Sequence, residues 1–169
     1  MITQKISQVK NLDINLKGIR MIEMIGTEGD ELCISGTEVK IDDKGGRSTD
    51  INFKGESDEI KIKIPTAMFN DIELCCTEAK ILIKDIKTGD LEIDSNDPLY
   101  ITAHNVTGNI KITQIKASSV LKVDKSSSFR TVCKGKNTLI ETAGFENNDS
   151  ASEYIELNGK DSTLTIESV

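Results

Sequence analysis

The sequence predicts an all-β protein, a short-coil parallel β-solenoid with about 19 residues and two strands per coil. The first observation behind this prediction is a three-residue apolar segment that recurs every 19 residues. Its copies are Ile72-Glu73-Leu74, Leu91-Glu92-Ile93, Ile110-Lys111-Ile112 and Phe129-Arg130-Thr131. The second observation is that no long window places apolar residues at helical spacing, so strands are expected throughout.

A second series of apolar segments falls midway between the first. Its members are Ile62-Lys63-Ile64, Ile81-Leu82-Ile83, Tyr100-Ile101, Leu121-Lys122-Val123 and Leu139-Ile140. Each coil therefore contributes two strands, and each strand is expected to pair in parallel with the strand one coil away. The outer residues of a triplet point inward and its middle residue points outward.

The outward residues of the first series define a candidate binding face. They are expected to form one exposed column of Glu73, Glu92, Lys111 and Arg130. Glu92 above Lys111 is a favourable stacked pair, whereas Glu73 above Glu92 is not. The other residues of the repeat are explained by the stacking of apolar side chains between neighbouring coils.

The length of 169 residues predicts a single domain, residues 1–169, with three parts. Residues 1–59 are expected to form less regular N-terminal strands. Residues 60–141 form the regular coils, which begin at the strictly alternating segment 60–65 and its closing proline. Residues 142–169 contain a polar loop and two short strands that are expected to cap the C-terminal end, because solenoids need an end that stops further strand pairing.

Charge and composition restrict the partners. The net charge of −7 argues against nucleic acid, whose binding draws on clustered Lys and Arg, and against anionic membrane surfaces. The sequence lacks a run of about 18 apolar residues, so no membrane insertion is expected. The expected partner is a protein or a glycan. Residues 1–8 lack the features of a signal peptide, which favours the cytoplasm; the cell surface is the alternative if an export signal lies outside this sequence.

The four cysteines are expected to be reduced thiols. Cys76 and Cys133 are 57 residues apart, which places them on one ladder three coils and about 14 Å apart, too far for a disulfide. Cys75 and Cys76 are adjacent on a strand and point to opposite faces, so they are not expected to bridge. Because no disulfide is expected, a reducing compartment is also favoured.

No catalytic, cofactor-binding or metal-binding residues are predicted. His104 is the only histidine, which excludes a multi-histidine metal site, and it lies at a predicted corner. Four aspartates, at Asp85, Asp90, Asp94 and Asp97, have oxygen ligands suited to calcium. Their spacing matches neither an EF-hand nor a calcium-binding nonapeptide, so they are interpreted as turn residues.

Several motifs together resemble one known family. A strand ending in proline, Ile60–Pro65, is followed by Ile72-Glu73-Leu74, and the repeat Thr-Gly-Asp/Asn-apolar occurs at 88–91 and 107–110. In these features the chain resembles a bacterial family of putative adhesins of unknown function with a β-solenoid, or single-stranded β-helix, fold. The resemblance implies a surface-binding role and supplies no catalytic residues. Corners such as Thr77-Glu78 depart from the family's usual Ser-Gly.

These observations predict a non-catalytic binding or scaffolding domain. Two alternatives remain open at this point. One is a carbohydrate-binding or carbohydrate-active β-helix protein, which would need clustered carboxylates in a shaped cleft. The other is a cytoplasmic accessory protein of cell-envelope functions.

Overall fold

The computed structural model describes residues 1–8 and 10–169 and is built almost entirely of strands. Its elements are β1 (Ile2–Lys5), β2 (Lys10–Thr27), β3 (Glu31–Ser35), β4 (Lys40–Asp43), β5 (Ser48–Pro65), the 3-10 helix η1 (Thr66–Met68), β6 (Phe69–Cys76), β7 (Ala79–Lys84), β8 (Lys87–Asp94), β9 (Leu99–His104), β10 (Thr107–Ile115), β11 (Ser118–Val123), β12 (Arg130–Ala143) and β13 (Tyr154–Ser168). The all-β prediction is confirmed. Among these residues no helix has the length and hydrophobicity needed to span a membrane.

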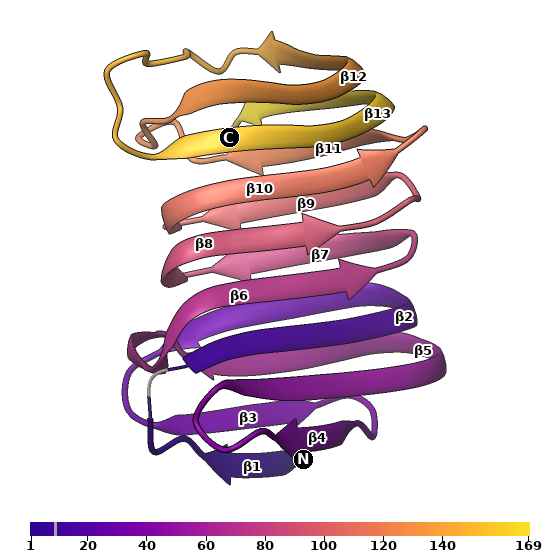
Figure 1. Cartoon of the computed structure of the whole chain (residues 1–169), viewed down its shortest axis with the longest axis vertical. Coiled ribbons are helices and arrows are strands. Elements are labelled where there is room, and N and C mark those ends of the chain that lie inside the picture. The colour runs from indigo at the N-terminus through magenta and orange to yellow at the C-terminus, as the bar shows by residue number, and fades with distance from the viewer. Residues whose placement is uncertain (9) are drawn as a thin grey trace.

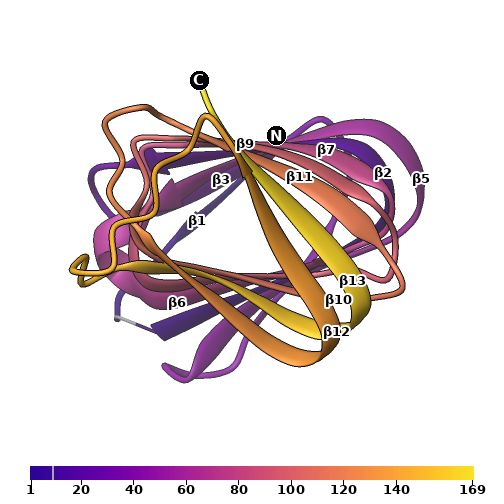
Figure 2. The same ribbon diagram turned by 90° about the horizontal axis from the view of Figure 1, so that it is seen from above.

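The middle of the molecule consists of parallel strands stacked along the long axis (Figure 1). Ile72 of β6 pairs with Leu91 of β8, which pairs with Ile110 of β10, so this ladder advances 19 residues at each step. Strands β7, β9 and β11 form a second parallel ladder behind it. Seen along the long axis, the parallel strands close around one core and give the molecule a barrel shape (Figure 2).

Tight corners connect the two ladders. Asp85, Asn105 and Lys116 have positive φ values of 55°, 51° and 55°, a backbone region that Asn and Asp tolerate better than most residues. Asn105 also donates a side-chain hydrogen bond of 2.7 Å to Asp85 on the neighbouring corner. Asn137 and Asp161 repeat this arrangement at 2.7 Å. The turn chemistry predicted for Asp85 is therefore present.

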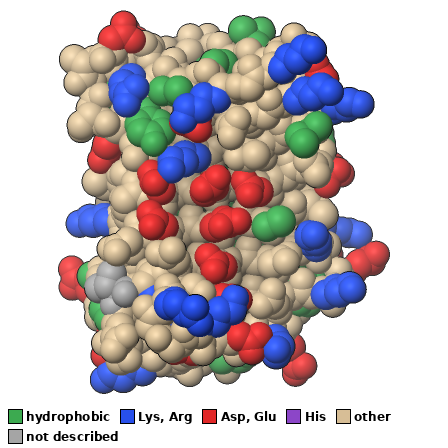
Figure 3. Space-filling view, viewed as in Figure 1, with side chains coloured by type: hydrophobic (Ala, Val, Ile, Leu, Met, Phe, Trp, Pro, Cys, Tyr) green, Lys and Arg blue, Asp and Glu red, His purple; other side chains and the backbone are tan. Residues whose placement is uncertain are grey.

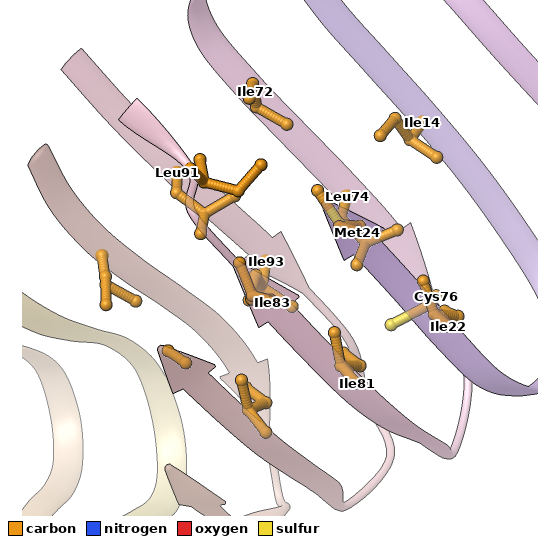
Figure 4. Packing of buried hydrophobic residues seen from close by; sticks show 14 of the residues in the cluster. Ile14, Ile22, Met24, Ile72, Leu74, Cys76, Ile81, Ile83, Leu91 and Ile93 are labelled. Atoms are coloured by element: carbon orange, nitrogen blue, oxygen red, sulfur yellow. The ribbon is translucent and has the colours of Figure 1, made fainter. Parts of the chain in front are cut away.

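The core is a set of stacked aliphatic columns (Figure 4). Ile72, Leu91 and Ile110 are completely buried, as are the residues two positions further along each strand. Ile or Leu at each rung presents the same shape to the rung above, so the layers pack without aromatic residues. The core cluster of the described residues also contains three buried aromatic side chains, those of Phe69, Phe129 and Phe145.

The N-terminal part is more regular than the sequence predicted. Strands β2 and β5 pair in parallel along nearly their whole length, and β2 also pairs with β6 and β7. Both strands therefore continue the two ladders. Gly18 interrupts β2 with φ +87°, and a Cβ there would lie 1.9 Å from the Gly55 carbonyl oxygen. The short strands β1, β3 and β4 lie at this end and pair antiparallel, β1 with β3 and both β3 and β4 with β5.

The predicted order of the C-terminal strands is wrong. Residues 154–168 do not cap the end as two short strands; they form one strand, β13, that lies between β10 and β11 on one side and β12 on the other. Ile110 consequently pairs with Ile155, and Arg130 pairs with Tyr154. The strand at the C-terminal end is β12, and the predicted loop begins only after Ala143.

A buried polar cluster fixes β13 in this position. Gln114 is 1% exposed, and its amide nitrogen donates to the carbonyl oxygens of Ala117 (3.1 Å) and Thr163 (3.0 Å). Ser119 donates to the amide oxygen of Gln114 at 2.7 Å, and Ser162 donates to the Gln114 carbonyl at 3.0 Å. Shifting β13 by one residue would break the hydrogen bonds to Thr163 and Ser162 and leave only those to Ala117 and Ser119, which is unfavourable because buried polar groups are costly when unpaired.

The cysteines occupy different environments. Cys76 is buried, Cys33 and Cys75 are half-buried, and Cys133 is exposed. Burial raises the pKa of the Cys76 thiol to about 12, which makes it unreactive. Cys133 pairs with Leu157 and therefore does not share a ladder position with Cys76, contrary to the prediction. Gln114 pairs with Gly159, and Gly159 pairs with Gly135, so β12 is also shifted by two residues from the register that the 19-residue spacing predicts.

The strand order makes a prediction for stability. Leu157→Ala opens a cavity beneath a covered layer and is expected to lower the free energy of unfolding by about 2–5 kcal/mol. Ile140→Ala removes a half-buried side chain from the end strand and is expected to cost about 1 kcal/mol. Urea denaturation of both variants measures the difference. If Ile140→Ala proves the more damaging change, the order β10–β13–β12 is incorrect.

Candidate binding face

The structure contains the predicted column of outward residues, but its last member is not Arg130. Glu73 pairs with Glu92, and Glu92 pairs with Lys111, as the spacing indicated. The next residue in the column is Glu156 of β13, because β13 displaces β12 by one rung. Arg130 lies two positions away along its strand, where its guanidinium is 5.0 Å from the centre of the Tyr154 ring.

The column extends below Glu73 into residues that the sequence did not group with it. Asp13 of β2 pairs with Glu73, and Asp50 of β5 pairs with Asp13. Four carboxylates thus stack from Asp50 to Glu92. Asp90 and Asp71 flank the column on one side, and Asp94 flanks it on the other.

We call six of these residues the acidic face: Asp13, Asp71, Glu73, Asp90, Glu92 and Asp94. Figure 3 shows carboxylates gathered at the middle of this side of the molecule, with Lys and Arg side chains above and below them. A shallow cleft of about 280 Å³ lies here, lined mainly by members of the acidic face and by Asn11. Its walls come from three neighbouring strands, β2, β6 and β8.

Cations neutralise the margins of the acidic face. Lys111 lies 2.6 Å from Asp90, and Asn109 donates to the same carboxylate at 2.8 Å. Although partial burial acts in the opposite direction, these hydrogen bonds lower the pKa of Asp90. Below the face, Lys44 forms an ion pair with Asp50.

The centre of the acidic face is electrostatically unfavourable. Desolvation, followed by the charges of Asp94, Asp13 and Glu92, raises the pKa of Glu73 above its ordinary value. Desolvation and the Asp94 charge likewise raise the pKa of Glu92. The pKa of Asp94 is also raised by desolvation. These three carboxylates are therefore held close together at a cost in electrostatic energy.

Two oxygen atoms beside the column lack hydrogen-bond donors. Within the described residues, Oδ1 of Asp94 and Oδ1 of Asn15 are buried atoms with no hydrogen-bond partner. Asp94 lies in β8 and Asn15 lies in β2, and both residues are on the outer side of the sheet that carries the column. An unpaired buried acceptor is costly, so both atoms add to the unfavourable energy of this side of the sheet.

The arrangement suits docking better than metal binding. In the described part of the chain no group of three or more His, Cys, Asp or Glu side chains has the geometry to hold a metal ion. The carboxylates are spread along a sheet instead of converging on one point. Such a row matches several cationic side chains of a partner, each contacting one or two carboxylates.

The remaining sequence candidates lie elsewhere. His104 is half-exposed at a corner, and its Nδ1 is 2.7 Å from Asp124 Oδ1. That hydrogen bond, together with one from the Asn105 backbone, lowers the pKa of Asp124. Asp97 lies in a turn where its backbone N–H donates to Ser95 at 3.0 Å. Asp90 and Asp94 lie within β8, so the turn interpretation is wrong for these two.

A second groove lies on the opposite ladder and was not anticipated. Met21, Lys80 and Tyr100 are neighbours on adjacent strands, and Tyr100 is 57% exposed. The groove measures about 610 Å³ and also includes Glu56 and Glu78. Gly18, which interrupts β2, also lines this groove. In the sequence, an aromatic residue at an outward position was the one available signal for it.

Comparisons with known proteins support the fold. A comparison with family models and with curated protein sequences gives no significant match. Among solved structures, the chain is similar to one from Clostridium sporogenes ATCC 15579, described as a putative cell adhesion protein. The TM-score is 0.63 at 13% identity, and the match covers 99% of this chain and 98% of that one.

A second similar structure is described as a putative adhesin from Bacteroides fragilis NCTC 9343. Its TM-score is 0.39 at 10% identity, and the match covers 99% of this chain and 96% of that chain. A TM-score this low does not show a shared fold. The Clostridium similarity shows the fold alone at this identity. Neither description names a ligand.

The raised pKa values predict how stability depends on pH. A carboxyl whose pKa is higher in the folded than in the unfolded state is destabilising when ionised, and this cost disappears below the ordinary pKa. Glu73→Gln is therefore expected to raise the melting temperature at pH 7 by about 1–4 °C and to change it little near pH 4. Differential scanning calorimetry at both pH values measures the effect, with Glu59→Gln on β5 as control. An equal gain at both pH values would exclude a charge effect.

Proposed function

We propose that the chain is a non-catalytic binding domain whose acidic face docks the basic surface of a protein partner. One observation supports this most directly: a column of stacked carboxylates that includes Glu73 and Glu92, with raised pKa values at its centre. Like charges directly opposite each other on neighbouring strands are destabilising. A surface that serves stability alone would alternate signs, as Lys61, Glu23 and Lys84 do elsewhere.

The proposed partner follows from chemistry. Lys and Arg side chains would neutralise the ionised carboxylates and donate charge-assisted hydrogen bonds to them. Because the whole chain carries a net charge of −7, long-range attraction would also accelerate encounter with a basic partner. The same charge is unfavourable for nucleic acid and for anionic lipid surfaces.

We further propose that the stacked strands are successive coils of a short-coil solenoid. The 19-residue advance along β6, β8 and β10 supports this interpretation, since each step returns the chain to an equivalent position. Stacked coils form a rigid, evenly spaced surface, and such a surface loses little conformational entropy when it binds. The similarity in fold to the described cell adhesion protein is compatible with this role.

The non-enzymatic part of the proposal rests on the shape of the acidic face. Glycoside hydrolysis needs an acid and a base or nucleophile on opposite sides of a bound sugar. Glu73 and Glu92 instead project side by side from adjacent parallel strands into a shallow cleft. The half-exposed His104 contacts Asp124 and no nucleophilic side chain in the described hydrogen bonds.

Glycan binding is the second candidate function, and the groove beside Tyr100 favours it. An exposed aromatic ring on a flat strand can stack against a sugar ring, while Glu56 and Glu78 can accept hydroxyl hydrogen bonds. Lys80 lies next to Tyr100 on the neighbouring strand, so an acidic sugar would fit best.

The acidic-face proposal is tested with two triple variants of equal net charge. Asp13→Asn, Glu73→Gln and Glu92→Gln together change the net charge from −7 to −4, as do Glu38→Gln, Glu59→Gln and Glu146→Gln at exposed sites elsewhere. The probe is a fluorescent oligolysine peptide, with oligoglutamate as negative control. Fluorescence anisotropy is expected to show roughly tenfold weaker binding for the first triple, since each lost pair is worth about 0.2–1 kcal/mol. Equal weakening by both triples would leave only a net-charge effect and refute the docking site.

The glycan candidate predicts a separate phenotype. Tyr100→Ala removes the stacking ring and is expected to weaken binding to any sialylated or uronate-containing glycan on an array by roughly tenfold. Tyr100→Phe keeps the ring and serves as the matched control. If the wild-type chain binds no glycan on the array, this candidate is discarded.

A further inference from the structure

The two ends of the stacked ladders differ in how their outermost strands are finished. At the N-terminal end, β1 and β4 are four residues each and pair antiparallel with their neighbours. Short strands of this kind offer little edge to another chain. At the C-terminal end, β12 has 14 residues and, within the described residues, pairs only with β13. The Thr131 N–H at the start of this edge donates to the Asn147 side chain, and the rest of the long edge is available for pairing.

The outer layer beside this edge is incompletely covered. Ile140 faces the core next to buried Leu164 but is only partly buried, and Leu139 is 52% exposed. Cys133, next to buried Leu157, is exposed. Apolar side chains that remain accessible on a long strand edge are typical of an interaction surface.

The charges along β12 are arranged in two halves. Lys134 and Lys136 lie before the corner at Asn137, and Glu141 lies after it. Lys134 already contacts the buried carboxylate of Glu156 at 2.7 Å, whereas Lys136 and Glu141 are both exposed. A strand with a cationic first half and an acidic second half is complementary to itself when reversed.

We infer that β12 is the interface of a symmetric dimer in which two copies of this chain pair end to end. A two-fold axis near the corner at Asn137 would place the first half of one β12 antiparallel to the second half of the other. Lys136 of each copy would then lie beside Glu141 of its partner, and Leu139 would be covered close to the axis. The interface is isologous, so each contact occurs twice.

The second copy fits this edge better than an unrelated strand does. Pairing with itself satisfies both charge groups at once, and it covers the edge on both molecules, which prevents further growth into a filament. The acidic face lies around β2, β6 and β8, away from this end, so dimerisation leaves it accessible.

Sedimentation equilibrium of the full chain over a concentration series tests the inference, with reducing agent present because Cys133 is exposed. The average mass is expected to rise from 18.5 kDa toward twice that value. Lys136→Glu and Glu141→Lys are each expected to weaken dimerisation roughly tenfold, because repulsion replaces two attractive pairs. The double variant restores opposite charges at both contacts and is expected to recover most of the affinity.

The controls separate folding from association. Circular dichroism and melting temperature confirm that each variant is folded, and Lys54→Glu with Glu59→Lys, exposed on β5, provides the matched charge reversal at a distance from β12. A wild-type chain that stays monomeric throughout the series overturns the inference. A dimer that survives both single reversals, or responds equally to the β5 control, places the interface elsewhere and also overturns it.

Discussion

The structure depends on in-register parallel pairing of strands that are about one repeat apart. In such a ladder every side chain lies directly above its equivalent on the next strand, whether it points into the core or into solvent. Inside, this alignment gives columns of Ile and Leu that pack with little variation. Outside, the same alignment places Asp13 beside Glu73 and Glu73 beside Glu92. In-register pairing therefore produces both the aliphatic columns of the core and the stacked charges on the surface.

Close backbone approach at the corners imposes the second constraint. A Cβ on Gly159 would lie 1.8 Å from the Gln114 carbonyl oxygen, and one on Gly135 would lie 1.9 Å from the Gly159 carbonyl oxygen. Glycine at these positions lets three consecutive strands turn at the same point. The Gln114 cluster lies beside them and specifies which strand belongs there. Geometry and hydrogen bonding thus cooperate to place β13.

The sequence predicted the all-β class and the ladder from Ile72 to Ile110 because spacing alone specifies them. It did not predict the neighbour of Ile110, since Phe129-Arg130-Thr131 and Ile155-Glu156-Leu157 have the same local pattern. Gln114 holds β13 through hydrogen bonds with Thr163 and Ser162, which are 49 and 48 residues away in the sequence. The regularity of the N-terminal strands was not predicted. Gly18 interrupts β2, and the segment that forms β3 and β4 separates β2 from β5, so the repeat spacing is not visible in this part of the sequence. Of the acidic face, the repeat revealed Glu73 and Glu92, whereas Asp13 required knowledge of β2.

The inverted order of the last two strands has a consequence for biosynthesis. Strand β12 leaves the ribosome before β13, yet its final neighbour is β13, so it has no native position until residue 168 has been made. Meanwhile the exposed edge of β10 is free to pair with the wrong segment, 129–131, which has a similar pattern. Folding of this end of the molecule therefore cannot be completed before β13 has been synthesised.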